Sequence, residues 1–151
     1  MKIKRIFFWS SILLIIGFTF SAASILFCHI AMAASPSMPN DVQMVQPDPS
    51  LPKELAAFWG KWEGSGHDSG VQKQIQYFLI VEKTSEEKAS LYTWHSVHGW
   101  SRREANVTKE NGKYKLWYKS NFGRNEITLK GEELVFDAQP GWFTINLKRV
   151  P

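Results

Sequence analysis

The sequence predicts an all-β fold, an antiparallel up-and-down barrel of eight strands that begins near residue 53. Three observations predict it. Apolar and polar side chains alternate along successive segments, turn-forming residues separate these segments at intervals of about 8–12 residues, and no segment after residue 59 has the length and period of a long helix. Eight short strands joined by hairpins leave two exposed edges unless the sheet closes on itself, which favours a barrel.

Alternation is clearest in five segments. The expected strands with this period cover residues 73–83, 113–119, 124–129, 133–137 and 143–148. The first of them carries Phe78 and Ile80 on its second face, which predicts that both of its faces are covered. The other four place polar side chains on one face and should be half-buried.

Turn signals separate the expected strands. Asn111-Gly112 is the strongest, because a two-residue hairpin loop needs a positive φ at both positions. Weaker signals lie at residues 121–123, 130–132 and 139–141, and residues 85–88 and 98–99 interrupt the earlier part of the chain. Pro52 suits the first position of a short helix, expected over residues 53–58.

The first 33 residues have the pattern of an export signal. Lys2, Lys4 and Arg5 precede an apolar run over residues 6–30, and Ala31-Met32-Ala33 has the small residues of a cleavage site. The run is also long enough to span a bilayer uncut and anchor the protein. Both alternatives predict an extracytoplasmic domain, periplasmic or secreted, because the positive charges stay inside.

Residues 34–52 are expected to form a disordered linker between the signal and the barrel of residues 53–151. This segment holds five of the seven prolines and few aliphatic residues, so it cannot bury much apolar surface. Cleavage after Ala33 would remove Cys28, the single cysteine of the chain. The mature chain would then contain neither a disulfide nor a thiol nucleophile.

The charge does not favour nucleic-acid binding. The net charge of the whole chain is +4, from 18 basic and 14 acidic residues. Without Lys2, Lys4 and Arg5, the basic count falls to 15 against the same 14 acidic residues. Acidic residues also dilute the pair Arg102-Arg103, so no basic patch is expected in the folded part.

Two short features resemble the calycin superfamily, which comprises lipocalins, fatty-acid-binding proteins and avidins. They are Gly60-Lys61-Trp62 after the short helix and Arg149 near the end of the last strand. The resemblance implies a lipocalin-like barrel in which Arg149 packs across Trp62 and closes one end. A guanidinium over an indole is a favourable cation–π contact. Residues 65–69 do not reproduce the Asn- and Ser-rich loop of an avidin biotin pocket.

Aromatic and cationic residues are densest between residues 92 and 103. This composition suits a small-ligand pocket, which needs flat apolar walls and a few oriented polar groups. Equally, the tryptophans and tyrosines of this segment could fill the core. The candidate ligand contacts are Tyr77, Tyr92, Trp94, His95, Trp100, Arg102 and Tyr118, and the candidate barrel-closing residues are Gly60, Trp62 and Arg149.

The expected function is therefore binding rather than catalysis. No nucleophile, base and orienting group can be assembled from the sequence, and His67, His95 and His98 lack the spacing of a metal site. No catalytic residue, metal or cofactor is expected. The favoured hypothesis is an exported module that binds a small apolar or amphipathic molecule in or at the mouth of its barrel. The alternative is an envelope structural or interaction module with a filled barrel.

Overall fold

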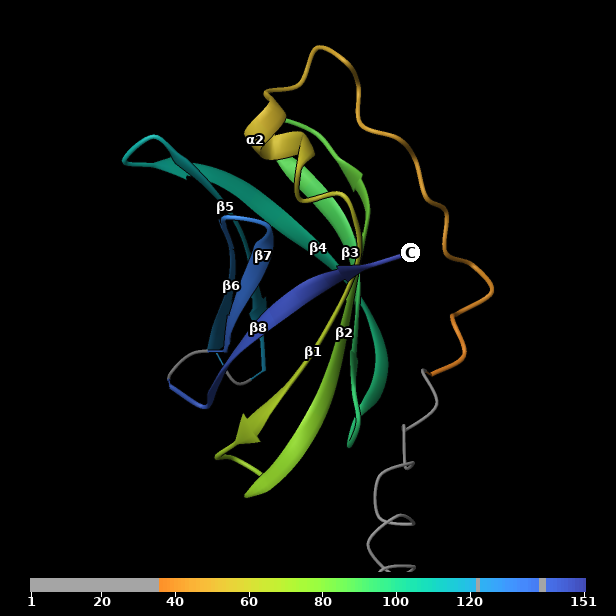
Figure 1. The fold of residues 1–151 in the computed structure, drawn as a ribbon, viewed down its shortest axis with the longest axis vertical. Coiled ribbons are helices and arrows are strands. Elements are labelled where there is room, and N and C mark those ends of the chain that lie inside the picture. The colour runs from red at the N-terminus through yellow and green to blue at the C-terminus, as the bar shows by residue number, and fades with distance from the viewer. Residues whose placement is uncertain (1–35, 122, 139–140) are drawn as a thin grey trace, which may run out of the picture. The chain divides into compact units, whose positions relative to one another are not determined.

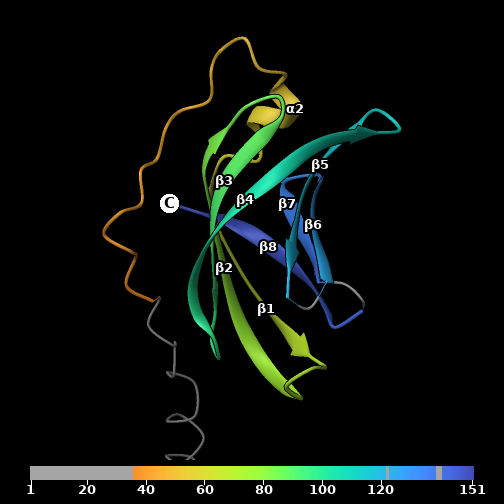
Figure 2. The same cartoon turned by 180° about the vertical axis from the view of Figure 1, so that it is seen from behind.

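Eight antiparallel strands form a closed barrel in which each strand pairs with the next along the chain (Figures 1 and 2). The computed structural model describes residues 36–121, 123–138 and 141–151, so the expected signal or anchor over residues 1–33 lies outside the described residues. The elements are α2 (Lys53–Ala56), β1 (Gly60–Asp68), β2 (Lys73–Thr84), β3 (Lys88–His95), β4 (Gly99–Glu110), β5 (Lys113–Ser120), β6 (Gly123–Lys130), β7 (Glu133–Ala138) and β8 (Phe143–Val150). The prediction of an all-β, eight-stranded up-and-down barrel is confirmed.

The two ends of the barrel differ. The turns between β1 and β2, β3 and β4, β5 and β6, and β7 and β8 surround one end, which we call the mouth. The other end, which we call the closed end, carries α2 and lies at the top of Figure 1. Helix α2 is shorter than the predicted segment 53–58, ending at Ala56. Leu55 and Phe58 are both 0 % exposed and plug this end with apolar surface.

The strongest predicted turn has the expected geometry. Asn111 and Gly112 adopt φ values of 50° and 78°, and they join Glu110 of β4 directly to Lys113 of β5. A positive φ at both central residues matches the right-handed twist of the two strands. This hairpin therefore sets the register between β4 and β5.

Strand β8 closes the barrel by contacting two neighbours in turn. Its first half pairs with β7, and its last residues pair with β1, where Trp62 lies opposite Arg149. Gly64 of β1 makes this approach possible, because a Cβ there would collide with the carbonyl oxygen of Asn146. The seam of the barrel thus depends on a missing side chain in β1.

The barrel interior is filled by aliphatic side chains. The inward positions Leu79, Val81, Leu91, Leu116, Ile127, Leu134, Ile145 and Leu147 are each at most 1 % exposed. Burial of one such side chain contributes about 1.5–3 kcal/mol relative to its exposure. Aliphatic side chains therefore fill the middle of the barrel.

A segment before α2 crosses the outer face of the barrel. We call residues 38–47 the strap. The backbone N–H of Val45 donates to the carbonyl oxygen of Glu82 at 2.9 Å, and the N–H of Gln43 donates to the Glu82 carboxylate at 2.7 Å. Asp41 accepts a hydrogen bond of 2.5 Å from the hydroxyl of Tyr92. That bond lowers the pKa of Asp41 below its usual value.

Glu82 can receive the strap because β2 carries a bulge there. The pairing of β2 with β3 steps from Val81 to Lys83, which leaves Glu82 without a partner in the ladder. Its side chain is only 2 % exposed and lies 3.4 Å from the guanidinium of Arg102. Ile80 on the same outer face is 2 % exposed, which confirms that β2 is covered on both faces.

Candidate functional site

The closed end contains the contact that the sequence predicted. The guanidinium carbon of Arg149 lies 4.2 Å from the centre of the Trp62 ring. Arg149 also donates hydrogen bonds to the carbonyl oxygens of Trp59 at 2.6 Å and Ala57 at 2.8 Å. Gly60 has a φ of 127°, and a Cβ at this position would collide with Arg149. The predicted stacking of Arg149 on Trp62 is confirmed, and Gly60 provides the space for it.

A cavity of about 160 Å³ opens at the mouth. Its walls come from all eight strands and from turn residues between them. Phe136 and Phe143 form an aromatic wall, with their rings stacked at 5.7 Å, and Tyr77 packs against Phe136 at 4.5 Å. Trp142 and Asn125 also line the space. The cavity therefore combines a flat apolar wall with polar groups, which is the usual composition of a small-ligand site.

Hydroxyl groups form the deepest polar part of the cavity. Tyr77 is 4 % exposed and Tyr118 is 5 % exposed, and their side chains hydrogen-bond to each other and to Thr93. Burial raises the pKa of Tyr77 well above its usual value and also raises the pKa of Tyr118. Both phenols therefore remain neutral donors at physiological pH.

Arg103 brings a positive charge to the cavity. It alternates with Ser101 and the buried Ala105, so it belongs to the inner face of β4, and it lines the cavity. No carboxylate of the described residues lies within ion-pair distance of Arg103. Its neighbour Arg102 points outward to Glu82 and Asp41. The chain thus presents one arginine to the strap and the next to the cavity.

Asp68 and His95 form a buried hydrogen-bonded pair in the wall of the cavity. The Nε2 of His95 lies 3.0 Å from Oδ2 of Asp68, and the N–H of Val97 donates to Nδ1 at 3.1 Å. Because Nδ1 accepts, the imidazole is neutral and Nε2 donates. Burial lowers the pKa of His95, and the bond to Asp68 opposes this shift. Both ring nitrogens are occupied, so this histidine is not a free base or a free metal ligand.

The candidate ligand contacts divide between the two faces of the sheet. Tyr77, His95 and Tyr118 line the mouth cavity together. Tyr92, Trp94, Trp100 and Arg102 alternate with the inward residues and lie on the outer face. The outer group forms its own cluster, with Trp94 and Trp100 at 6.5 Å and Arg102 at 5.3 Å from the ring of Tyr92. The structure therefore does not bring the seven residues to one site.

Several cavity residues were not among the sequence candidates. They are Asp68, Thr93, His98, Ser101, Arg103, Asn125, Phe136, Trp142 and Phe143. Strict alternation around the buried Ala105 would have selected Arg103 rather than Arg102 as the inward arginine.

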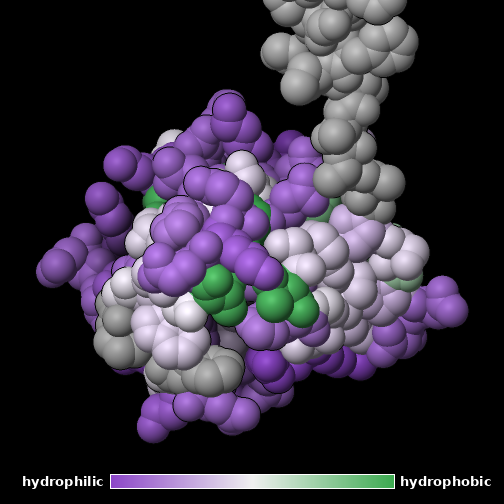
Figure 3. Space-filling view, turned by 90° about the horizontal axis from the view of Figure 1, so that it is seen from below, coloured by the Kyte–Doolittle hydropathy of each residue, from purple (hydrophilic) through white to green (hydrophobic). Residues whose placement is uncertain are grey.

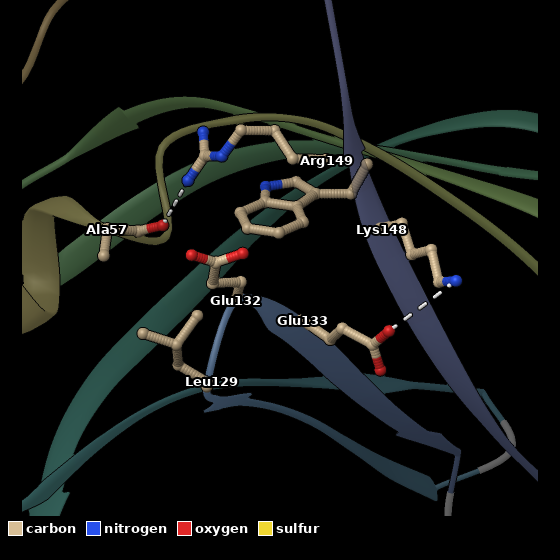
Figure 4. Close-up of a pocket in the computed structure, with 8 residues that line it drawn as sticks. Ala57, Leu129, Glu132, Glu133, Lys148 and Arg149 are labelled. Atoms are coloured by element: carbon tan, nitrogen blue, oxygen red, sulfur yellow. Dashed lines mark hydrogen bonds and ion pairs between the residues drawn. The ribbon is translucent and has the colours of Figure 1, made fainter.

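A second hollow, of about 590 Å³, lies at the closed end (Figure 4). It is an open groove between the turn that follows Leu129 and the last residues of β8. Glu133 and Lys148 lie across it at 3.9 Å, and the Arg149 guanidinium faces Ala57 (Figure 4). In this groove Lys148 lies near Glu133, and Arg149 donates two short hydrogen bonds to backbone carbonyls. Arg103 at the mouth makes one longer hydrogen bond, of 3.3 Å, to the carbonyl oxygen of Arg102, and has no acidic partner among the described residues. We therefore take the mouth cavity as the candidate site.

Two further properties concern the part of the chain that the structure describes. No three histidine, cysteine or acidic side chains gather there in a way that could hold a metal ion. No helix in residues 36–121, 123–138 and 141–151 is long and apolar enough to cross a membrane.

Comparisons with known proteins identify no relative. No protein-family model matches the chain, and neither a curated protein nor a solved structure matches it significantly. The eight-stranded antiparallel barrel fits a calycin-like fold.

Proposed function

We propose that this protein is an exported, lipocalin-like module that binds a small amphipathic molecule at the mouth of its barrel. The anionic head of the ligand would enter the cavity, and its apolar part would lie along the aromatic wall at the mouth. The proposal rests on one observation above all. Arg103 faces a cavity of hydroxyl and amide groups and has no acidic partner among the described residues.

The polar groups of the cavity suit an anionic head. A guanidinium binds a carboxylate through charge-assisted hydrogen bonds, which are stronger than neutral ones. Tyr118 and Asn125 lie on the same cavity and could donate to the remaining lone pairs of the head. The phenol of Tyr118 stays protonated because burial raises its pKa.

The size of the cavity limits how the ligand binds. Pockets that enclose a drug-sized ligand usually measure about 300–1,000 Å³, and the mouth cavity measures about 160 Å³. Aliphatic side chains fill the barrel beyond it. Only the head of an amphipathic molecule fits inside, so the apolar part would remain at the mouth, beside Trp142 and Phe143.

A non-enzymatic role is also part of the proposal. His95 is the buried titratable side chain of the cavity that is best suited to proton transfer, but Asp68 and the N–H of Val97 occupy both of its ring nitrogens. The expected export signal supports an extracytoplasmic location, with or without an uncleaved anchor over residues 6–30.

A titration with two matched probes tests the proposal. Decanoate and decyltrimethylammonium share an apolar chain and carry opposite head charges. We expect decanoate to bind and to change the tryptophan fluorescence, because Trp142 lines the cavity. Arg103→Met should weaken decanoate binding about 10- to 100-fold, from the loss of hydrogen bonds between charged groups.

Arg102→Met is the matched control. This arginine neighbours Arg103 but faces the strap on the outer surface, so its replacement should leave decanoate binding within about twofold. Thermal unfolding of both variants checks that they are folded. Equal affinity for the two probes, or decanoate binding that is insensitive to Arg103→Met, would overturn the proposal.

A further inference from the structure

The turns around the mouth are held in place by the Asp68–His95 pair. Oδ1 of Asp68 accepts from the N–H groups of Gly70 at 2.7 Å and Val71 at 3.3 Å. Oδ2 of the same carboxylate accepts from His95, and His95 accepts from the N–H of Val97. A continuous set of hydrogen bonds therefore fixes the turn between β1 and β2 relative to the turn between β3 and β4.

A third turn is joined to the first. The backbone N–H of Ser69 donates to the carbonyl oxygen of Trp142 at 3.1 Å, and the Ser69 hydroxyl donates to the same oxygen at 2.5 Å. Trp142 precedes β8, so the turn between β7 and β8 is fixed against the turn between β1 and β2. We call these three turns the rim.

Each turn of the rim carries an apolar side chain. Val97 is 48 % exposed, the largest exposed fraction among the exposed large apolar residues of the described chain. Val71 and Trp142 are half-buried against the core in the other two turns. Seen from the mouth end, hydrophobic groups lie in the middle of a largely hydrophilic surface (Figure 3). The hydrogen bonds of the rim thus hold apolar tips together at one end of the molecule.

The charges next to the rim are mainly positive. Lys73 begins β2 and Lys119 lies near the end of β5, and both are exposed and form no ion pair within the described residues. Among the described residues, two acidic side chains lie at this end, of which Asp68 is buried and Asp137 keeps its charge. Asp68 is 2 % exposed and bonded to His95, and Asp137 accepts a hydrogen bond of 3.0 Å from the hydroxyl of Thr144.

We propose that the rim is a docking surface for an anionic lipid bilayer. Apolar tips enter the boundary between headgroups and acyl chains, and neighbouring lysines are attracted to anionic headgroups. The cavity opens inside the rim, so the amphipathic ligand of the proposed function would pass directly between bilayer and cavity. Only this last step rests on the proposed function, since docking itself needs no ligand.

Lipid-dependent quenching on the full chain tests the docking surface. In a Cys28→Ser background, a fluorophore is attached through Val97→Cys or, as the matched control, through Val45→Cys. Val45 is 45 % exposed, almost the same as Val97, but it lies on the strap away from the rim. The protein is reconstituted in vesicles of phosphatidylcholine, with or without phosphatidylglycerol, that carry headgroup nitroxides.

We expect strong quenching of the label at position 97, an increase when phosphatidylglycerol is present, and little quenching at position 45. Lys73→Gln and Lys119→Gln should each weaken the docking of the rim on vesicles with phosphatidylglycerol about fivefold, as followed by quenching at position 97. Equal quenching at both positions, or no dependence on phosphatidylglycerol, would overturn the proposal. Arg103→Met separates the two proposals, because it should weaken decanoate binding about 10- to 100-fold and leave the quenching at position 97 unchanged.

Discussion

Replacement of Arg149 by methionine should destabilise the barrel more than any other single change of an exposed charge. Methionine keeps the apolar stem but loses the charge and the donors. The two hydrogen bonds to Ala57 and Trp59 contribute about 1 kcal/mol each at this exposed position. The cation–π contact with Trp62 adds about 0.5–1 kcal/mol.

Together these contacts stabilise the barrel by about 2.5–3 kcal/mol. For a domain of this size, their loss corresponds to a decrease in Tm of about 10–20 °C. Thermal unfolding followed by circular dichroism measures the decrease. Lys148→Met is the matched control, because the neighbouring Lys148 is exposed and its nearest acidic oxygen, on Glu133, lies 3.9 Å away. If the two variants unfold within about 3 °C of each other, Arg149 does not close the barrel in the way described.

Three further predictions concern the seam, the strap and the buried histidine. Gly64→Ala should lower the free energy of unfolding, measured with denaturant, by about 1–3 kcal/mol, because the new Cβ would collide with the carbonyl oxygen of Asn146. An unchanged free energy of unfolding would exclude the close contact between β1 and β8. Asp41→Ala should accelerate hydrogen exchange of the Val45 amide and leave the barrel amides unchanged, since the strap loses its bond to Tyr92. His95 has a lower pKa in the folded than in the unfolded state. Its contribution to the free energy of unfolding is therefore complete above about pH 6.5 and is lost as the pH falls through the pKa of the folded state. The unfolding equilibrium should change at most tenfold per pH unit in this window, and His95→Gln should remove that dependence.

The fold could be predicted largely from the alternation of apolar and polar side chains and from the turn residues between the strands. Half-buried strands show their two faces as alternation, and Asn111-Gly112 has the two residues that positive φ values favour. The contact between Trp62 and Arg149 could also be predicted, because Arg149 is in phase with the inward residues of β8. Gly64 could not be recognised, since its role depends on how closely β8 approaches β1.

The candidate site was harder to predict, because both faces of β2 to β4 carry large apolar residues. Tyr92, Trp94 and Trp100 lie on the outer face, where Tyr92 bonds to the strap, so this aromatic cluster does not mark the barrel interior. This is why Arg102, which has aromatic neighbours, was a candidate and Arg103 was not. The strap itself has no hydrophobic period. It binds through backbone groups at the bulge of Glu82, and a bulge leaves no clear signal in the sequence.

The most direct test of the account is to locate a bound amphiphile on the barrel. Isotope-edited NOE spectra of carbon-13-labelled decanoate with the protein measure which ring and methyl protons lie near its chain. Binding at the mouth predicts NOEs from the decanoate chain to Phe143 and Trp142. NOEs confined to Leu129 and Trp62 in the groove at the closed end, or none at saturating decanoate, would contradict it.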